Sequence, residues 1–201
     1  RSLVAAWSPV DRRFSGGQPT GIESLDTALG GGLPAGQLTE FVVESGGQFV
    51  LARLLETTRS SRQRVALIDA SDTFAPECVG PELLRHLVWA RCRAPAEALA
   101  VADILIRDGN YAAVMLDLRD AAVPALNRIP GTSWHRLHRV AERQSAAILV
   151  LSRHGAVPAV RFRLLVSLDL SLAGLRRAHA ELLQNLSVET LRGFCAAERT
   201  A

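Results

Sequence analysis

Short apolar segments that alternate with amphipathic stretches are the feature that most constrains how this chain folds. Five largely apolar segments of five or six residues lie at 38–43, 65–69, 86–90, 112–116 and 147–151. Between them, the stretches at 49–58, 95–107 and 133–144 place apolar side chains on one helical face. Buried strands alternating with helices are typical of a parallel sheet covered on both faces. The sequence therefore predicts a three-layer α/β fold with a mostly parallel central sheet flanked by helices.

The segments outside this alternation suggest how the chain is divided. The stretch at 15–21, S-G-G-Q-P-T-G, is typical of a flexible entry, so residues 1–18 are expected to form a flexible N-terminal arm. The core domain is expected over 19–172, opening with a short helix at 22–29 and closing with an edge strand within 160–170. The structure of the tail, 173–201, stays open, because Leu182, Leu183 and Leu186 have helical spacing whereas 187–191 alternates weakly, like a strand.

Composition narrows the chemistry that is available to the chain. Of its 201 residues 48% are hydrophobic and 21% charged, which argues against disorder. All 23 basic residues are arginine, so lysine bases, Schiff-base chemistry and a lysine in a phosphate-binding loop are excluded. The three cysteines are an odd, widely spaced number, which favours a reducing, cytoplasmic location over a disulfide framework. No apolar run approaches the roughly 18 residues of a membrane span, so no membrane partner is expected.

Three motifs near the start of the core carry a family resemblance. Residues 20–26 read T-G-I-E-S-L-D, residues 31–36 read G-G-L-P-A-G, and residues 44–49 read E-S-G-G-Q-F where a strand passes into a helix. In order and spacing they resemble the RecA-family recombinases, in which T-G-x-x-x-L-D and G-G-L-P-x-G lead into the phosphate-binding loop G-P-E-S-S-G-K-T. The resemblance runs to about residue 170, with Asp117 ending the Walker B strand and Ser152 ending the strand of the nucleotide-sensing residue. It implies a RecA-like three-layer αβα fold.

The nucleotide site implied by this resemblance lacks most of its chemical groups. An ungapped alignment puts Val42 at the first glycine of the loop, Gln48 at its lysine and Phe49 at the Mg²⁺-binding Ser/Thr, while Ser71 falls at the catalytic glutamate. An amide cannot neutralise a transferring phosphoryl group, and a phenyl ring cannot bind magnesium. The sequence therefore predicts no ATP hydrolysis, no cofactor and no catalytic residue. The degenerate nucleotide site comprises Glu44, Ser45, Gly46, Gly47, Gln48, Phe49 and Asp117.

Arginines follow the strands that precede the DNA-binding loops of the recombinases. The corresponding stretches here are 118–132 and 153–160, and the polar face of the helix between them is also basic. Ligands of open α/β sheets bind near the carboxyl ends of the strands, and guanidinium groups suit phosphate. The alternative is a solvated arginine-rich face that binds nothing. The candidate DNA-binding residues are Arg119, Arg128, Arg136, Arg153, His154 and Arg161.

Other side chains give weaker signals. His135 and His138 lie three residues apart on a helix, but no cysteine or carboxylate at matching spacing completes a metal site, so none is predicted. The resemblance implies a role for Trp7 and Phe14 in partner contact, because RecA-like domains often dock a neighbour through an aromatic residue on an arm.

Taken together, the chain resembles the ImuA-type RecA-like proteins of bacterial mutagenesis cassettes. This resemblance implies a non-catalytic accessory protein of DNA repair or SOS-type translesion mutagenesis. Its implied partners are polymerase-type or RecA-type proteins, with DNA and self-association as further candidates. The alternative is a divergent RecA/KaiC-type protein that still binds ATP weakly through its glycine amides and Asp117. A third reading is a structural scaffold that meets neither DNA nor nucleotide.

Overall fold

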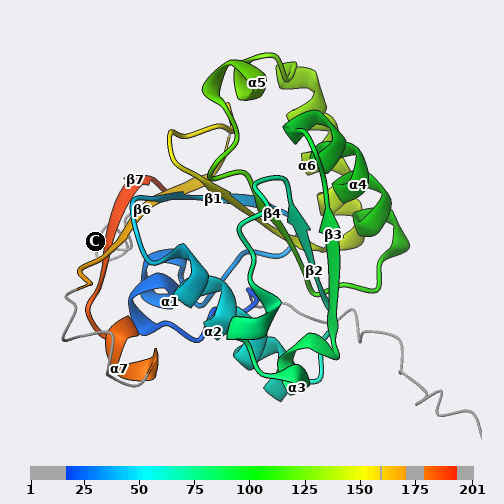
Figure 1. Ribbon diagram of the computed structural model, residues 1–201. Coiled ribbons are helices and arrows are strands. Elements are labelled where there is room, and N and C mark those ends of the chain that lie inside the picture. Colours follow the sequence, from blue (N-terminus) through cyan, green and yellow to red (C-terminus); the bar gives the residue numbers. More distant parts are fainter. Residues whose placement is uncertain (1–16, 159, 171–178, 194–201) are drawn as a thin grey trace, which may run out of the picture.

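One seven-stranded sheet forms the centre of the molecule (Figure 1). The computed structural model describes residues 17–158, 160–170 and 179–193. The strand order is β3-β2-β4-β5-β1-β6-β7, and every neighbouring pair is parallel except β6 and β7. The predicted fold class is thereby confirmed. The strands are β1 (Leu38–Val43), β2 (Val65–Asp69), β3 (Leu87–Arg91), β4 (Ala113–Asp117), β5 (Ala147–Ser152), β6 (Phe162–Leu168) and β7 (Leu186–Arg192).

Helices cover both faces of this sheet because successive strand residues point to opposite sides. Leu67, Met115 and Leu149 pack in one buried cluster with α1 (Glu23–Leu29), α2 (Gly47–Ser60) and α7 (His179–Leu183). The alternate residues Ile68, Leu116 and others pack with α4 (Pro95–Asp108), α5 (Val123–Asn127) and α6 (Gly131–Gln144). The short η1 (Pro76–Cys78) and α3 (Pro81–Leu84) lead into β3. Within the described ranges, no helix is long and apolar enough to cross a membrane.

The end of the chain differs from the expected arrangement. The strand expected within 160–170 is confirmed as β6, but its expected position at the edge of the sheet is wrong, because β6 lies between β1 and β7. The edge is formed by β7, which comes from the tail whose structure the sequence left open. It pairs antiparallel with β6, for example Val188 with Val166. The residues of β7 after Val188 are exposed. Because this part of the edge strand has no buried face, its sequence alternates only weakly between apolar and polar residues.

The T-G-x-x-x-L-D segment ties the start of the described chain to the core. The Asp26 carboxylate accepts hydrogen bonds from the backbone N–H and the hydroxyl of Thr20, both at 2.8 Å, and from the N–H of Gly21 at 3.1 Å. From α2, Arg53 Nε donates to the Gly21 carbonyl at 3.0 Å and the Thr57 hydroxyl to the Thr20 carbonyl at 3.2 Å. The motif therefore has a structural role, which is to hold residues 20–21 against α2.

A buried histidine joins α2 to the start of β3. His86 is 3% exposed, and its Nε2 lies 3.0 Å from the hydroxyl oxygen of Thr58. That hydroxyl donates to the Leu54 carbonyl at 2.8 Å, so the ring Nε2 carries the proton and donates to Thr58. The other ring nitrogen, Nδ1, is buried with no partner in the described part of the chain. Burial, and next the positive charge of Arg59, hold the pKa of His86 below its ordinary value of 6.5.

This histidine makes stability depend on pH. Because its pKa is lower in the folded state, the unfolded chain takes up a proton first as the pH falls through about 6.5. We expect the free energy of unfolding, measured with urea between pH 8 and 5.5, to fall below pH 6.5 by up to about 1.4 kcal/mol per pH unit from this group. His86→Asn should flatten that fall, whereas His135→Asn, at an exposed position, should not. Equal slopes in the wild type and His86→Asn would contradict the assignment.

Candidate functional site

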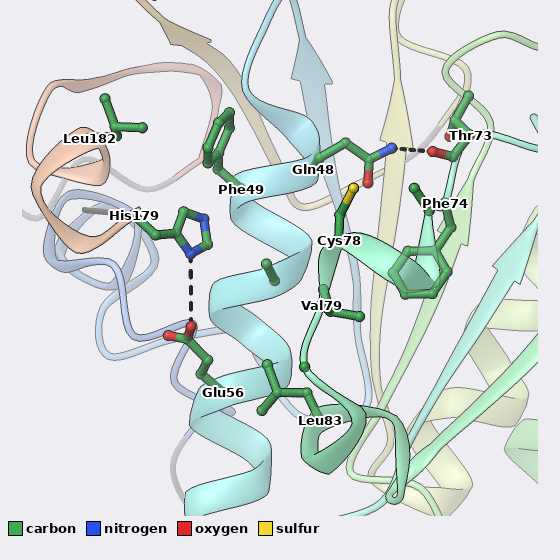
Figure 2. A pocket seen from close by; sticks show the side chains of 13 residues that line it. Gln48, Phe49, Glu56, Thr73, Phe74, Cys78, Val79, Leu83, His179 and Leu182 are labelled. Atoms are coloured by element: carbon green, nitrogen blue, oxygen red, sulfur yellow. Dashed lines mark hydrogen bonds and ion pairs between the residues drawn. The ribbon is translucent and has the colours of Figure 1, made fainter. Parts of the chain in front are cut away.

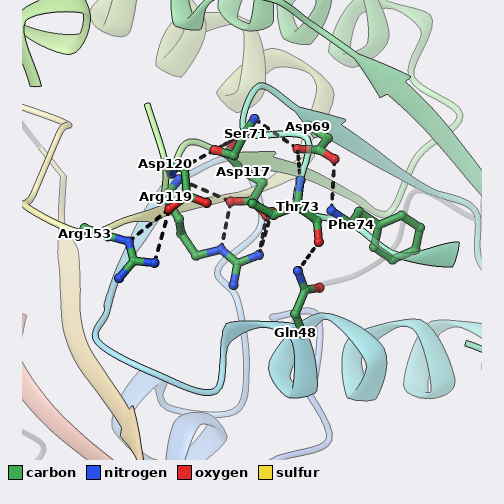
Figure 3. A network of polar contacts seen from close by, with 9 residues as sticks. All are labelled: Gln48, Asp69, Ser71, Thr73, Phe74, Asp117, Arg119, Asp120 and Arg153. Carbon is green, nitrogen blue, oxygen red and sulfur yellow. Dashed lines mark hydrogen bonds and ion pairs between the residues drawn. The ribbon is translucent and has the colours of Figure 1, made fainter. Parts of the chain in front are cut away.

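Two carboxylates lie side by side at the carboxyl edge of the sheet. Asp69 ends β2 and Asp117 ends β4; they are partners in the strand register, and both are fully buried. The Asp69 carboxylate accepts the backbone N–H groups of Ser71, Thr73 and Phe74 at 3.0, 3.3 and 3.1 Å (Figure 3). Asp69 thereby compensates its buried charge with backbone dipoles and holds the loop that follows β2 in a turn.

The Asp117 carboxylate is instead paired with an arginine. Arg119 Nε donates to one carboxylate oxygen at 2.9 Å and Nη2 donates to the other at 2.6 Å (Figure 3). This two-pronged pairing is the strongest geometry for these groups, and the Arg119 side chain is only 10% exposed. Thr73 closes the cluster, since its hydroxyl donates to Asp117 at 3.0 Å and accepts from Arg119 Nη2 at 3.1 Å. Both oxygens of Asp117 are therefore engaged by the protein itself.

The same guanidinium lies against the glycine loop between β1 and α2. A Cβ atom added to Gly47 would lie 2.2 Å from Arg119 Nη1, so glycine is needed for this approach. Gly46 has φ +81°, and a Cβ there would lie 2.6 Å from the Cβ of Leu168. The Ser45 hydroxyl donates to the Leu168 carbonyl and accepts its N–H, both at 2.8 Å. Leu168 of β6 thus holds the loop in place. The loop and Arg119 border a hollow of about 280 Å³, which Glu44 and Arg153 also line.

Three of the four side chains that depart from the recombinase pattern, all except Val42, lie at the site and contact other parts of the protein. Gln48 Nε2 donates to the Thr73 carbonyl at 2.5 Å (Figure 2). The ring of Phe49 turns toward α7 and lies 5.1 Å, centroid to centroid, from the ring of His179. The Ser71 hydroxyl accepts the N–H of Asp120 at 3.0 Å and lies within hydrogen-bond distance of the Asp117 carbonyl. None of the three brings a charged group to the site.

A third buried carboxylate, which the sequence reasoning missed, sits in the middle of β1. Glu40 is fully buried and accepts the Ser152 hydroxyl at 2.8 Å, the N–H groups of Ala156 and Val157 at 2.5 and 3.2 Å, and Arg163 Nε at 2.7 Å. Ser152, expected to face nucleotide, is thus bonded to Glu40. The network fastens the loop after β5. Its signal in the sequence was an acidic residue within an otherwise apolar strand, matched by an arginine on β6.

The candidate DNA-binding residues are not gathered on one surface. Arg119 and Arg153 line the hollow at the glycine loop, where Arg153 is 51% exposed and pairs with Asp120 at 3.2 Å. Arg128 and Arg136 line a different hollow, between α4, α5 and α6. Arg161 precedes β6, which runs parallel to β1, so it lies at the opposite, amino-terminal edge, over the ring of Phe162. His154 is exposed on the loop after β5.

Other sequence candidates add no further site. Within the described ranges no three His, Cys, Asp or Glu side chains form a group that could hold a metal ion. His138 lies 3.8 Å from Glu142, one turn further along α6, and His135 is exposed. Trp7 and Phe14, expected to contact a partner, lie outside the described residues.

The fold of this protein has a counterpart among solved structures. Its sheet carries a glycine turn between β1 and α2 and an aspartate at the end of β4. A crystal structure of the RadB recombinase has the same fold, with a TM-score of 0.58 and 19% sequence identity, over 76% of this chain and 84% of that one.

Sequence comparison relates the chain to RecA itself. It is 32% identical over 145 residues to the RecA protein of Rubrobacter xylanophilus, covering 62% of this chain and 42% of the relative. The RecA protein of Clavibacter michiganensis is also 32% identical over 145 residues, which cover 62% of this chain and 40% of that protein. The chain thus spans about 40% of the length of the curated relatives it matches. No protein-family model matches it.

The pairing of Arg119 with Asp117 has a measurable effect on stability. Arg119→Ala leaves a fully buried carboxylate unpaired, so we expect it to lower the free energy of unfolding in urea by about 3 kcal/mol. Adding Asp117→Asn should recover at least about 1 kcal/mol of this loss, because the uncompensated charge is then gone.

The matched control is Arg153→Ala, which breaks a half-exposed ion pair between the end of the neighbouring strand β5 and Asp120, and should cost less than about 1 kcal/mol. If Arg119→Ala lowers the free energy of unfolding no more than Arg153→Ala does, or if Asp117→Asn recovers none of the loss, the ion pair between Arg119 and Asp117 does not stabilise the site as stated.

Proposed function

We propose that this chain is a RecA-like accessory protein that does not hydrolyse ATP and acts in DNA repair or SOS-type translesion mutagenesis. Its action is to bind polymerase-type or RecA-type proteins, with DNA as a further ligand. The repair context is supported by the relationship to RecA and by the fold shared with a recombinase. The choice of polymerase-type partners is supported by the resemblance to the ImuA-type proteins.

The observation that carries the non-catalytic part is the position of Arg119. In a nucleotide-hydrolysing site of this fold, the space between the glycine loop and the β4 aspartate holds phosphates and Mg²⁺. Here a guanidinium lies in that space, with one nitrogen against Gly47 and two bonded to Asp117. A cation bound to both oxygens of Asp117 competes directly with a metal ion for them. The protein supplies the counter-charge that a ligand would otherwise bring.

The remaining side chains support the same reading. Gln48 has no positive charge to offer a phosphate and its amide is bonded to Thr73. Phe49 brings a ring where a hydroxyl would bind magnesium, and Ser71 offers no carboxylate to activate water. Replacement of all three groups removes charge neutralisation, metal binding and base catalysis at once.

One feature favours the alternative, which is a divergent RecA/KaiC-type protein with weak ATP binding. The turn before α2 has the left-handed backbone that glycine favours, with Gly46 at φ +81°, and α2 begins at Gly47. The N–H groups of residues 45–47 have no acceptor in the described part of the chain. Exposed N–H groups at a helix start attract anions such as phosphate. This alternative requires the Arg119 guanidinium to leave Asp117 or to bind the phosphate in place of a lysine.

A nucleotide titration separates the two proposals. We expect calorimetry to detect no binding of Mg·ATP at concentrations up to about 1 mM, and no release of phosphate. Micromolar affinity, or turnover that Asp117→Ala abolishes, would overturn the non-catalytic proposal.

A pair of variants tests the part assigned to Arg119. Gln48→Lys with Phe49→Thr restores the lysine and the hydroxyl, and we expect it to bind Mg·ATP only weakly while Arg119 is present. Adding Arg119→Ala should tighten binding by at least about tenfold, because Asp117 is then free to accept the metal. Equal affinity with and without Arg119, at matched thermal stability, would show that the guanidinium does not block the site.

Binding of DNA is expected to use Arg153 rather than Arg119. Arg119 is nine-tenths buried and bonded to Asp117, whereas Arg153 is half-exposed beside the glycine loop. For single-stranded DNA, each phosphate contact contributes about 0.7 to the slope of log affinity against log salt. Arg153→Ala should therefore reduce that slope by about 0.7 in fluorescence anisotropy titrations at several salt concentrations.

The control for this measurement is Arg85→Ala, an exposed arginine on the segment that enters β3 from the opposite edge of the sheet. It should leave the slope unchanged. Equal effects of the two variants would remove Arg153 from the proposal, and absence of salt-dependent binding would remove DNA as a ligand while leaving the accessory role in place.

A further inference from the structure

Positive charge is concentrated in one continuous part of the chain. Residues 121–168 contain seven arginines and a single acidic residue, Glu142, so their formal net charge is +6, whereas that of the whole chain is +3. The Glu142 carboxylate lies 3.8 Å from Nε2 of His138. One of the seven arginines, Arg163, is neutralised by the buried Glu40. Charge asymmetry of this size points to a polyanionic partner where the remaining arginines share a surface.

Three of these arginines share the solvent-facing side of α6. Arg136, Arg139 and Arg143 are exposed and lie three and four residues apart, which is the spacing of neighbours on one helical face. The opposite face of α6, with Trp134 and Leu137, is buried in the core. At about 1.5 Å per residue, the three positions extend over roughly 10 Å of the helix axis. We call these three residues the α6 ridge.

The charges of the α6 ridge are largely left for a ligand. Within the described ranges, Arg139 and Arg143 have no ion-pair partner. Arg136 lies 3.7 Å from a carboxylate oxygen of Asp103, but Arg107 already binds both oxygens of that carboxylate, at 2.8 and 3.2 Å. Asp103 is thus neutralised by its neighbour on α4, and the ridge keeps its positive charge.

The α6 ridge runs along the flank of the molecule. In Figure 1, α6 lies beside α4 in the helical layer on one face of the sheet. The helix ends at Gln144, just before β5 begins, so it runs from the carboxyl edge of the sheet toward the amino edge. Near its start, the exposed Arg128 lines the same hollow as Arg136. Positive charge therefore continues from the ridge toward the carboxyl edge.

The packing of the aromatic side chains indicates which form of DNA suits this face. Within the described ranges, none of the seven Phe, Trp and Tyr residues is exposed. Trp134 faces the core from α6 itself, and Trp89 contacts Phe74 and Arg91. Proteins bind single strands by combining positive charge with rings on which the bases stack. A face that offers guanidinium groups alone suits a duplex, whose bases stay stacked on one another and whose phosphates have the higher charge density.

We propose that the α6 ridge binds the phosphate backbone of double-stranded DNA by charge, without contacts to the bases. The inference rests on the proposed role of DNA as a ligand, but not on Arg153, the glycine loop or nucleotide. Successive phosphates of one strand are about 3.4 Å apart along the duplex axis, so the ridge matches roughly three of them. Guanidinium groups pair well with phosphate, and such contacts carry no sequence information.

Charge-matched variants of the full chain test this surface. The α6 variant replaces the three ridge arginines: Arg136→Gln, Arg139→Gln and Arg143→Gln. The control variant replaces three exposed arginines outside 121–168: Arg62→Gln, Arg85→Gln and Arg93→Gln. Fluorescence anisotropy titrations of a short blunt-ended duplex at several salt concentrations give the slope of log affinity against log salt. We expect the α6 variant to reduce that slope by about 2.7, for three phosphate contacts of about 0.9 each, and the control to leave it unchanged.

Titrations with a single strand of the same length and with polyglutamate complete the test. We expect the wild-type chain to bind the duplex more tightly than either. Equal slopes for the α6 variant and the control, at matched thermal stability, would overturn the proposal, and so would tighter binding of the single strand. Polyglutamate binding as tight as that of the duplex, and lost in the α6 variant, would also overturn it and assign the ridge to an acidic protein.

Arg153→Ala separates this inference from the function proposed above. If the α6 variant leaves duplex binding unchanged while Arg153→Ala lowers the slope for single strands, the α6 ridge is not a DNA surface and the assignment of Arg153 stands. If the chain binds no DNA at any salt concentration, both assignments fail, and the accessory role with protein partners is unaffected.

Discussion

Parallel pairing of β2 with β4 places two buried carboxylates next to each other, and the local structure is organised around that constraint. Two fully desolvated negative charges in register repel and cost free energy unless each is compensated. Asp69 is compensated by backbone N–H groups, which makes the chain after β2 turn back at once. Asp117 is compensated by Arg119, which brings a guanidinium over the sheet edge. The turn of the loop after β2 and the position of Arg119 in the hollow at the glycine turn both result from these two ways of compensating a buried charge.

Arg119 links the sheet to the glycine loop. A Cβ at residue 47 would lie 2.2 Å from its guanidinium, so with glycine at the start of α2 the loop accepts this neighbour without displacing it. The site is therefore electrically complete without a ligand: the carboxylate, the guanidinium and the Thr73 hydroxyl satisfy one another. Charged groups that satisfy each other in a buried place are costly to separate, so a metal ion would have to displace a partner that is already bound.

Most of the fold could be predicted from the sequence because buried parallel strands are continuous apolar runs. The runs at 38–43 and 65–69 coincide with β1 and β2, and the other three are within a residue of their observed bounds. The position of β6 could not be predicted, since it depends on β7, whose exposed half removes the alternation that reveals a strand. The pairing of Arg119 with Asp117 was also missed. Its signal was the spacing of two residues after a strand, which puts both side chains on one side of the backbone.

Glu40 shows why contacts of this kind escape a reading of the sequence. Its partners come from β5, from the loop after it and from β6, more than 110 residues away, and only the folded sheet brings them together. A carboxylate buried in β1 demands such partners, so its presence in an apolar run predicts a buried network but not which residues complete it. In this chain the network fastens the loop that carries Arg153 and His154. Arg153, which lines the hollow at the glycine turn, is thus presented by a loop whose base is fixed. In the proposed binding of DNA, this would lower the entropy lost on contact with a phosphate.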